Sequence, residues 1–437
     1  MKFMLLTPGT GHFFCGSCLR DNLLGRALRR LGHEVTVVPL YLPLVLEEGP
    51  EDTPVHMGGI NMYLQQKTKL ARLLPRWIAN LLDRPALLRW ASRRSHLTEA
   101  PDLGAMTVSM LQGEHGHQEK EIEKLVEWTL SVERPDVIML SNIMLAGVAR
   151  RLKDTLRRPV VATLQGEAPF LDALPEPYSR QSWRVLEERT HDIDAFVPVS
   201  GSYGRTMQTR LNLDEGRVHV IYNGIDMEEF AQEPRPLESR MPPTIGYLAR
   251  MCRDKGLHTL VQAFAILKGR GSVEGLRLAV AGVMLAEDRR FVEEMKGLLK
   301  SGGWSGDAEF KPNVDRAEKH AFLQSIAVLS VPATYGESFG LYLLEAMASG
   351  VPVVQPRHGA FPEILDSTGG GILCDPDDPT SLADALEALL RDGSRAGELA
   401  LTGRRSVLEK FTSEHMAREF ENLCTMISSP RPIRTVS

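Results

Sequence analysis

Cysteine is scarce in this sequence, with five residues among 437. This low number excludes a fold held together by disulfide bonds, as found in small secreted domains. Cys15 and Cys18 form the one closely spaced pair, a pattern that can bind a metal or carry out redox chemistry. Only His12 lies near enough in the sequence to join them as a ligand, so we interpret the pair as a loop that tolerates small thiols and assign no metal.

Long apolar runs are also missing. Residues 3–6 are too few for the core of a secretory signal, and no stretch of about 18 apolar residues follows them. The net charge of -5 gives no reason to expect nucleic acid as a partner. We therefore expect a cytoplasmic protein that binds no nucleic acid.

The length of 437 residues exceeds what one hydrophobic core ordinarily holds, which predicts two domains. Residues 2–7, 19–31 and 35–40 alternate as strand, helix and strand, the typical opening of a Rossmann-like sheet. The glycines that follow the first strand do not match the GxGxxG spacing of a dinucleotide-binding loop. The second strand also ends in Leu40 and Tyr41, without an acidic ribose ligand, so a dehydrogenase is disfavoured.

The same alternation resumes near residue 135 and repeats after residue 244, which predicts short parallel strands with helical crossovers in both halves. A stretch with four prolines at 232–243 is typical of a linker. We predict an N-terminal α/β domain at 1–228 with a helical insertion at 42–130, and a C-terminal α/β domain at 229–414. Residues 415–437 are expected to form a helix that packs back on the N-terminal domain, followed by a disordered tail. Two doubly wound sheets facing each other would bind ligands in a cleft at the carboxyl ends of their strands.

The segment 67–94 carries eight basic residues against one acid, Asp83, together with leucines and two tryptophans. A basic amphipathic helix with tryptophan can lie on an anionic membrane surface. Pro75 and Pro85 interrupt any long continuous face, which favours an insertion packed on the protein. Peripheral contact with the inner face of the membrane through 67–94 is the alternative.

Residues 328–365 contain the pattern on which the prediction of function is built: strand, polar loop, helix, strand, loop and helix. The start of a helix exposes unpaired N–H groups and the positive end of its dipole, which favours an anion. Glu337 and Glu345 are eight residues apart, which would separate them by about 12 Å along one helix. That distance is too long for the carboxyl pair of a retaining glycosidase. It suits contacts with two hydroxyls of one extended ligand, and the alternative is a capping residue and an ordinary surface residue.

Two cations follow the strand predicted at 244–249. Arg250 and Lys255 would lie at the mouth of the predicted cleft, beside the helix start described above. Together they could hold a diphosphate and stabilise the negative charge that develops as a phosphate ester bond breaks. The alternative is a solvated basic loop.

These motifs together resemble the retaining GT-B glycosyltransferases of family 4, the group 1 glycosyltransferases, over nearly the whole chain. Glu337 and Glu345 fit the E-x7-E motif of that family, and Arg250 and Lys255 fit its R-x4-K motif. Residues 220–226 are similar to the segment that leads into its linker. The resemblance implies a GT-B fold of two Rossmann-like doubly wound domains. It also implies transfer of a sugar, with retention at the anomeric carbon, from a nucleotide diphosphate sugar to an acceptor hydroxyl on a sugar, a lipid or a small molecule.

The resemblance also implies a role for each matching residue. Arg250 and Lys255 would hold the diphosphate and Glu337 the donor sugar, and these three are the predicted catalytic residues. The Gly16 amide and the backbone at 338–341 would assist in holding the diphosphate, and Glu345 would bind the ribose. The predicted donor-binding residues are Gly16, Arg250, Lys255, Val314, Glu337, Ser338, Phe339, Gly340, Leu341 and Glu345. No metal or other cofactor is implied, because the cations replace the metal.

The chain departs from the family pattern in three places. Cys15 replaces the first glycine of the N-terminal pair, and Lys311 with Pro312 follows Phe310 where a glycine is usual, near the base. After the strand at 160–164 the family often has a histidine, and this chain has Gln165, which can donate a hydrogen bond but cannot carry a proton.

Because of these departures, the resemblance does not identify the residues that bind the acceptor. The candidate acceptor or sugar contacts are His12, Gln165 and Glu167. The alternative functions are another GT-B nucleotide-sugar enzyme, such as an epimerase or a phosphorylase, and a non-catalytic nucleotide-sugar-binding protein.

Overall fold

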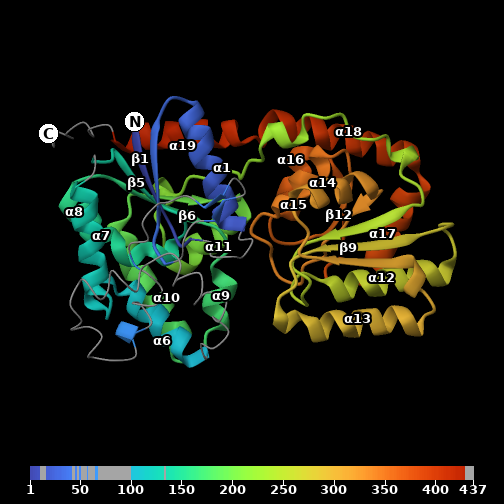
Figure 1. Ribbon diagram of the computed structural model, residues 1–437, viewed down its shortest axis with the longest axis horizontal. Coiled ribbons are helices and arrows are strands. Elements are labelled where there is room, and N and C mark those ends of the chain that lie inside the picture. The colour runs from blue at the N-terminus through green and yellow to red at the C-terminus, as the bar shows by residue number, and fades with distance from the viewer. Residues whose placement is uncertain are drawn as a thin grey trace. The chain divides into compact units, whose positions relative to one another are not determined.

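The computed structural model in Figure 1 describes residues 1–9, 16–41, 45–46, 49–50, 57, 64–66, 100–131 and 134–428. The chain divides into two compact units. Unit 1 comprises Met1–Tyr222 and the residues from Glu414 onward, and unit 2 comprises Asn223–Ser413. Several features of the predictions lie wholly or partly outside the described residues: His12, Cys15, much of the insertion at 42–130 with its basic segment 67–94, and the tail after residue 428.

A five-stranded parallel sheet forms the centre of unit 1, with the order β2-β1-β5-β6-β7. Its strands are almost entirely buried, as expected for a parallel sheet covered on both faces. The strand order reverses between β1 and β5, so the loops that follow these two strands diverge to opposite sides. The strands are β1 (Lys2–Thr7), β2 (Glu34–Pro39), β5 (Val137–Leu140), β6 (Val160–Leu164) and β7 (Ala195–Pro198).

Helices pack on both faces of this sheet. On one face, α1 (Gly16–Arg30) and the C-terminal helix α19 (Ser413–Ser428) share a core with β1, to which α19 contributes the buried ring of Phe420. On the other face, the core includes side chains from α7 (Glu119–Ser131) and α8 (Ala149–Leu156). The described part of this unit also contains α6 (Ala100–Leu111), α9 (Ala168–Ala173), α10 (Tyr178–Arg189) and α11 (Gly201–Leu211), and a short antiparallel pair joins β3 (Val45–Leu46) and β4 (Gly49–Pro50).

Unit 2 contains a six-stranded parallel sheet with the order β10-β9-β8-β11-β12-β13. The strand order reverses between β8 (Thr244–Leu248) and β11 (Val328–Leu329), which pair directly in the register Val328 with Ile245. The other strands are β9 (Arg277–Gly282), β10 (Ala308–Pro312), β12 (Val353–Pro356) and β13 (Gly371–Cys374). Two doubly wound parallel sheets confirm the predicted α/β fold class.

Seven α-helices of unit 2 surround this sheet, and three of them, α14, α17 and α18, begin with a side-chain cap. Asp315 and Glu318 form a reciprocal capping box at the start of α14, and Asp378 accepts from two N–H groups at the start of α17. The helices are α12 (Leu257–Arg270), α13 (Arg289–Ser301), α14 (Arg316–Ser325), α15 (Leu341–Ala348), α16 (Phe361–Thr368), α17 (Pro379–Arg391) and α18 (Gly393–Lys410).

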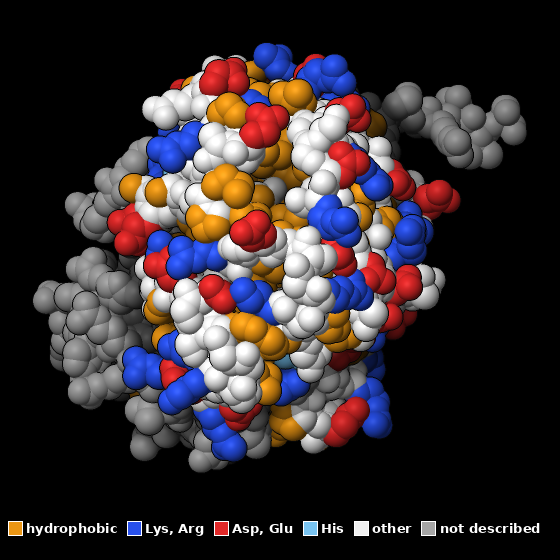
Figure 2. Space-filling model, turned by 90° about the vertical axis from the view of Figure 1, so that its right-hand side faces the viewer, with side chains coloured by type: hydrophobic (Ala, Val, Ile, Leu, Met, Phe, Trp, Pro, Cys, Tyr) orange, Lys and Arg blue, Asp and Glu red, His pale blue; other side chains and the backbone are white. Residues whose placement is uncertain are grey.

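The surface shows no large field of one sign on the face drawn in Figure 2, where acidic and basic side chains are interspersed with apolar ones. Within the described ranges, no helix combines the length and the apolar character needed to cross a bilayer.

Candidate functional site

The predicted charged residues of unit 2 meet at the point where its strand order reverses. The loop after β8 carries Arg250 and Lys255, and the loop after β11 carries Glu337. Because β8 and β11 are neighbours and parallel, both loops leave the same edge of the sheet. The two loops are joined by a backbone hydrogen bond of 2.9 Å from Thr334 N to Asp254 O. The topology thus brings together residues that are 82 positions apart in the sequence.

Lys255 and Glu337 form an ion pair, in which the Lys255 ammonium donates to Glu337 Oε2. The Tyr342 hydroxyl donates to the same oxygen at 3.2 Å. The Glu337 side chain is 9% exposed, and the ammonium also lies 5.0 Å from the centre of the Tyr335 ring. Burial alone would lower the pKa of Lys255, but the Glu337 carboxylate outweighs it and the pKa is raised above its ordinary value. Lys255 is therefore a permanent cation held against a buried carboxylate.

Two glycines allow the loops to approach this closely. Gly256 has a φ of 73°, and a Cβ atom at this position would lie 1.7 Å from the carbonyl oxygen of Pro332. Gly340 has a φ of 88° and immediately precedes α15, which begins at Leu341. Both conformations are left-handed, where only glycine avoids a steric cost. The carbonyl of Glu337 also accepts a hydrogen bond of 2.9 Å from Ala360 N, which fixes the backbone of its loop.

Arg250 is held by two acidic residues that the sequence interpretation did not include. Its Nε and Nη2 atoms donate to the two carboxylate oxygens of Asp288 at 2.9 and 3.0 Å, and Nη2 donates to Glu287 at 2.5 Å. These hydrogen bonds to Asp288 raise the pKa of Arg250 further. The backbone carbonyl of Arg250 accepts from the Tyr247 hydroxyl at 2.7 Å. Both the side chain and the backbone of Arg250 are thus fixed.

Glu345 lies within α15 and forms its own ion pair, with Lys319 of α14 at 2.7 Å. The two glutamates therefore have separate cationic partners, since Glu337 precedes the helix and Glu345 lies inside it. Ser338, Phe339 and Leu341, also predicted to bind the donor, flank this helix start, whereas Val314 lies before α14. The Phe339 side chain is buried, Ser338 and Leu341 are half-buried, and Val314 is half-buried next to the capping residue of α14.

In unit 1, the predicted contacts follow β6. Gln165 donates through its side-chain nitrogen to the carbonyl of Ser141 at 2.5 Å. The buried Glu167 carboxylate accepts from the backbone N–H groups of Gln165 and Gly166 and from the Tyr203 hydroxyl at 3.0 Å. Burial raises the pKa of Glu167, and the backbone hydrogen bonds oppose that effect. Gly16 begins α1.

A buried charged pair lies beneath Gln165 and was missed in the sequence. Asp21 and Arg20 of α1 are both inaccessible to solvent and joined by a 2.9 Å hydrogen bond. Asp21 also accepts from the Ser141 hydroxyl, so it connects α1 to the residue that follows β5. The Arg20 guanidinium stacks 4.8 Å from the ring of Phe420. Consecutive charges on a helix do not by themselves indicate burial, so this pair could not be predicted from the sequence.

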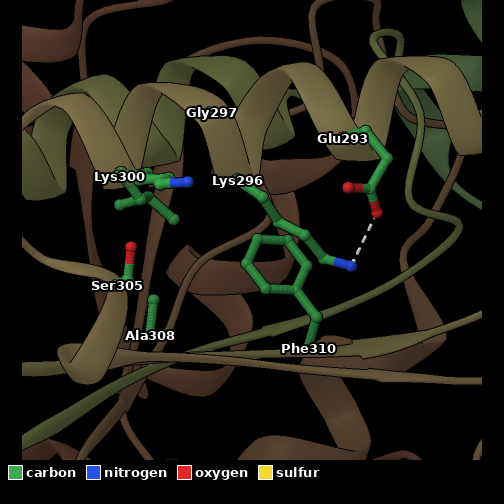
Figure 3. Close-up of a pocket in the computed structure, with 8 residues that line it drawn as sticks. Glu293, Lys296, Gly297, Lys300, Ser305, Ala308 and Phe310 are labelled. Atoms are coloured by element: carbon green, nitrogen blue, oxygen red, sulfur yellow. Dashed lines mark hydrogen bonds and ion pairs between the residues drawn. The ribbon is translucent and has the colours of Figure 1, made fainter.

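A separate pocket of about 440 Å³ lies between α13 and β10 (Figure 3). Lys296 extends from α13 past the Phe310 ring, 5.5 Å from its centre, and pairs with Glu293 at 2.8 Å. The pocket is lined by Ala308, the first residue of β10, whereas the site residues follow the carboxyl ends of the strands. The pocket is therefore not part of the site around Glu337.

Two family descriptions match the chain. Residues 229–405 match the group 1 glycosyl transferases, and residues 122–229 match glycosyltransferase family 4. An uncharacterized glycosyltransferase of Methanocaldococcus jannaschii is 26% identical over 93% of this chain and 93% of its own length. A D-inositol 3-phosphate glycosyltransferase of an Arthrobacter species is 28% identical over 86% of this chain and 91% of its own length.

Solved structures show the same fold. Sucrose-phosphate synthase from Thermosynechococcus elongatus aligns with a TM-score of 0.72 at 18% identity, covering 98% of both chains. HepE of Anabaena, in complex with UDP and glucose, aligns with a TM-score of 0.69 at 17% identity, covering 98% of this chain and all of HepE. These similarities assign the GT-B fold.

Proposed function

Because the chain belongs to the group 1 glycosyltransferases, we propose that it transfers a sugar from a nucleoside diphosphate sugar to an acceptor hydroxyl with retention of the anomeric configuration. The observation that carries this proposal is the Lys255–Glu337 ion pair at the reversal of strand order in unit 2. Ligands of open α/β sheets bind at that point. A buried carboxylate next to a cation suits a ligand that has both hydroxyl groups and phosphates.

In this proposal, the charged residues of the site bind different parts of the donor. Arg250 and Lys255 follow the same strand and supply the positive charge for a diphosphate, including the charge that grows on it as the bond to the sugar breaks. Glu337 is an acceptor for the hydroxyls of the transferred sugar, because a carboxylate can accept several hydrogen bonds. Glu345, on the helix, is an acceptor for the ribose, in competition with Lys319. In this proposal the two cations act without a metal.

The first donor to test is UDP-glucose, since the structurally similar HepE was crystallised with UDP and glucose. The experiment incubates the protein with UDP-glucose and other nucleotide sugars, with and without EDTA, and with a panel of sugar, lipid and small-molecule acceptors. NMR of the product gives the configuration of the new glycosidic bond. A retained configuration and turnover in EDTA would support the proposal, and inversion would contradict it.

Site variants then test the residues. Lys255→Ala and Glu337→Ala are expected to lower kcat/KM by at least about 100-fold, the usual scale for losing one transition-state contact. Lys296→Ala and Glu293→Ala are matched controls, because they break a Lys–Glu pair elsewhere in unit 2 and should leave turnover unchanged. If the site variants stay within a few-fold of the wild type, the assignment is wrong. A chain that binds nucleotide sugars without turnover on the whole acceptor panel would instead be a binding protein.

A further inference from the structure

Asp288 holds Arg250 in a geometry that leaves one part of the guanidinium available. Asp288 receives two hydrogen bonds, from Nε and Nη2 of Arg250, at 2.9 and 3.0 Å. Paired hydrogen bonds of this kind fix the plane of a guanidinium as well as its position. No hydrogen bond to Nη1 occurs among the residues that the structure describes, and the Arg250 side chain is 39% exposed. Nη1 can therefore donate to an incoming anion.

Asp288 is itself fixed. Its side chain is 6% exposed, and Oδ2 accepts a further hydrogen bond of 2.9 Å from Leu285 N. The backbone N–H of Asp288 donates back to the carbonyl of Leu285 at 3.1 Å. These reciprocal bonds close the short turn that leads into α13. The carboxylate is thus anchored to the backbone before it contacts Arg250.

The neighbouring acid contacts Arg250 in a different way. Glu287 accepts from Nη2 at 2.5 Å, but its side chain is 68% exposed. An exposed ion pair contributes at most about 1 kcal/mol, because water competes for both charges. A pocket of about 380 Å³ is lined by Arg250, Glu287 and Asp288, so solvent has access beside this contact. A ligand with several negative charges could displace Glu287 but not the buried Asp288.

We propose that Asp288 is a positioning residue that orients Arg250 toward the donor diphosphate, and that Glu287 is a displaceable competitor for the same guanidinium. This inference rests on the proposed function, because it needs a diphosphate ligand. It extends the site to two acidic residues that do not contact the donor. The two acids are adjacent in the sequence and bind the same arginine, so each is the control for the other.

The test measures binding of UDP, GDP and ADP by calorimetry to the wild type, Asp288→Asn and Glu287→Gln. For the nucleotide that binds, Asp288→Asn is expected to weaken affinity about 10-fold or more, since a misoriented group at a site can cost up to about 100-fold. Glu287→Gln is expected to leave affinity unchanged or to raise it up to about fivefold. Equal effects of the two substitutions would overturn the inference.

A double-mutant cycle separates positioning from stability. If Asp288 acts through Arg250, then adding Asp288→Asn to Arg250→Ala should cause no further loss of nucleotide affinity. A purely structural role would lower the thermal midpoint of Asp288→Asn without changing its nucleotide affinity, and that result would overturn the inference. If the wild type binds none of the three nucleotides and turns over none of the nucleotide sugars of the panel, the proposed function fails and this inference fails with it. If the wild type and Asp288→Asn bind equally well, only this inference fails.

Discussion

Replacing Lys255 by methionine tests the central ion pair, because it removes the charge and keeps most of the aliphatic side chain. Glu337 would then keep a hydrogen bond from the Tyr342 hydroxyl at 3.2 Å, with only 9% of its side chain exposed to water. Removing one partner of a fully buried pair costs about 3–5 kcal/mol. Lys255 is 22% exposed, so water can partly replace it, and we expect a loss of about 2–3 kcal/mol in the free energy of unfolding.

Replacing Glu337, the other partner of the pair, should lower the free energy of unfolding by less. In Glu337→Gln, the Lys255 ammonium keeps its partial exposure and the Tyr335 ring at 5.0 Å, and we expect a loss of about 1 kcal/mol. The double variant contains neither charge, so its loss should also be near 1 kcal/mol instead of the sum. The cycle therefore predicts a coupling energy of about 2–3 kcal/mol between the two side chains.

Urea denaturation of the four proteins gives the stabilities, and turnover with the identified donor gives the activities. Stability should recover in the double variant and activity should not, because the proposed function needs both groups. Recovery of both would mean that the pair only stabilises the fold. A coupling energy below about 0.5 kcal/mol would refute the description of the pair as buried and coupled. Lys296→Met is the control for charge removal at an exposed pair and should change stability by less than about 0.5 kcal/mol.

Three further predictions concern stability. Gly256→Ala should lower the free energy of unfolding, measured by urea denaturation, by at least about 2 kcal/mol, because the backbone is left-handed there and the new Cβ atom would collide with the Pro332 carbonyl. Gly269→Ala in α12 is the control: there is open space around this position, so the substitution should leave the stability unchanged or raise it. Asp21→Asn leaves the buried Arg20 charge without its carboxylate and should cost about 3–5 kcal/mol; a loss below about 1 kcal/mol would contradict the pairing. Burial and the nearby Arg253 lower the pKa of His258. The contribution of His258 to stability is therefore present above pH 6.5 and is lost as the pH falls through the lowered pKa, by at most about 1.4 kcal/mol per pH unit. Between pH 7.5 and 5.5, His258→Gln should lose less of its free energy of unfolding than the wild type. An identical pH dependence of the two proteins would contradict this role of His258.

The sequence predicted the elements of unit 2 well because its strands are short, apolar and bounded by glycine or proline. It could not predict that Lys255 pairs with Glu337, because that contact depends on β8 and β11 being neighbours. The role of Asp288 could not be predicted either, since an acidic residue before a helix is an ordinary sequence feature. Its contact with Arg250 again comes from the sheet, in which β9 lies beside β8.

The apolar run at 218–222 has the pattern of a short strand, but no strand forms there. The segment runs beside β7 and donates from His219 N to Phe196 O and from Ile221 N to Pro198 O, with a single bridge at Val218. β7 has only four residues, so it presents few carbonyl groups on that side. An apolar run in the sequence indicates burial, but a strand also needs a partner of sufficient length.

Both cations of the site already have carboxylate partners, which affects how a donor would bind. A diphosphate would compete with Glu337 for the Lys255 ammonium, and Glu337 is too buried to lose that contact without a replacement. The hydroxyls of a donor sugar are the replacement that the proposed function supplies, because they can donate to Glu337 while Lys255 turns to the phosphates. A nucleoside diphosphate without its sugar would satisfy Lys255 and leave Glu337 with the Tyr342 hydroxyl. Under the proposed function, recognition of the sugar and recognition of the diphosphate would be coupled through one ion pair, because the complete donor would satisfy both groups at once.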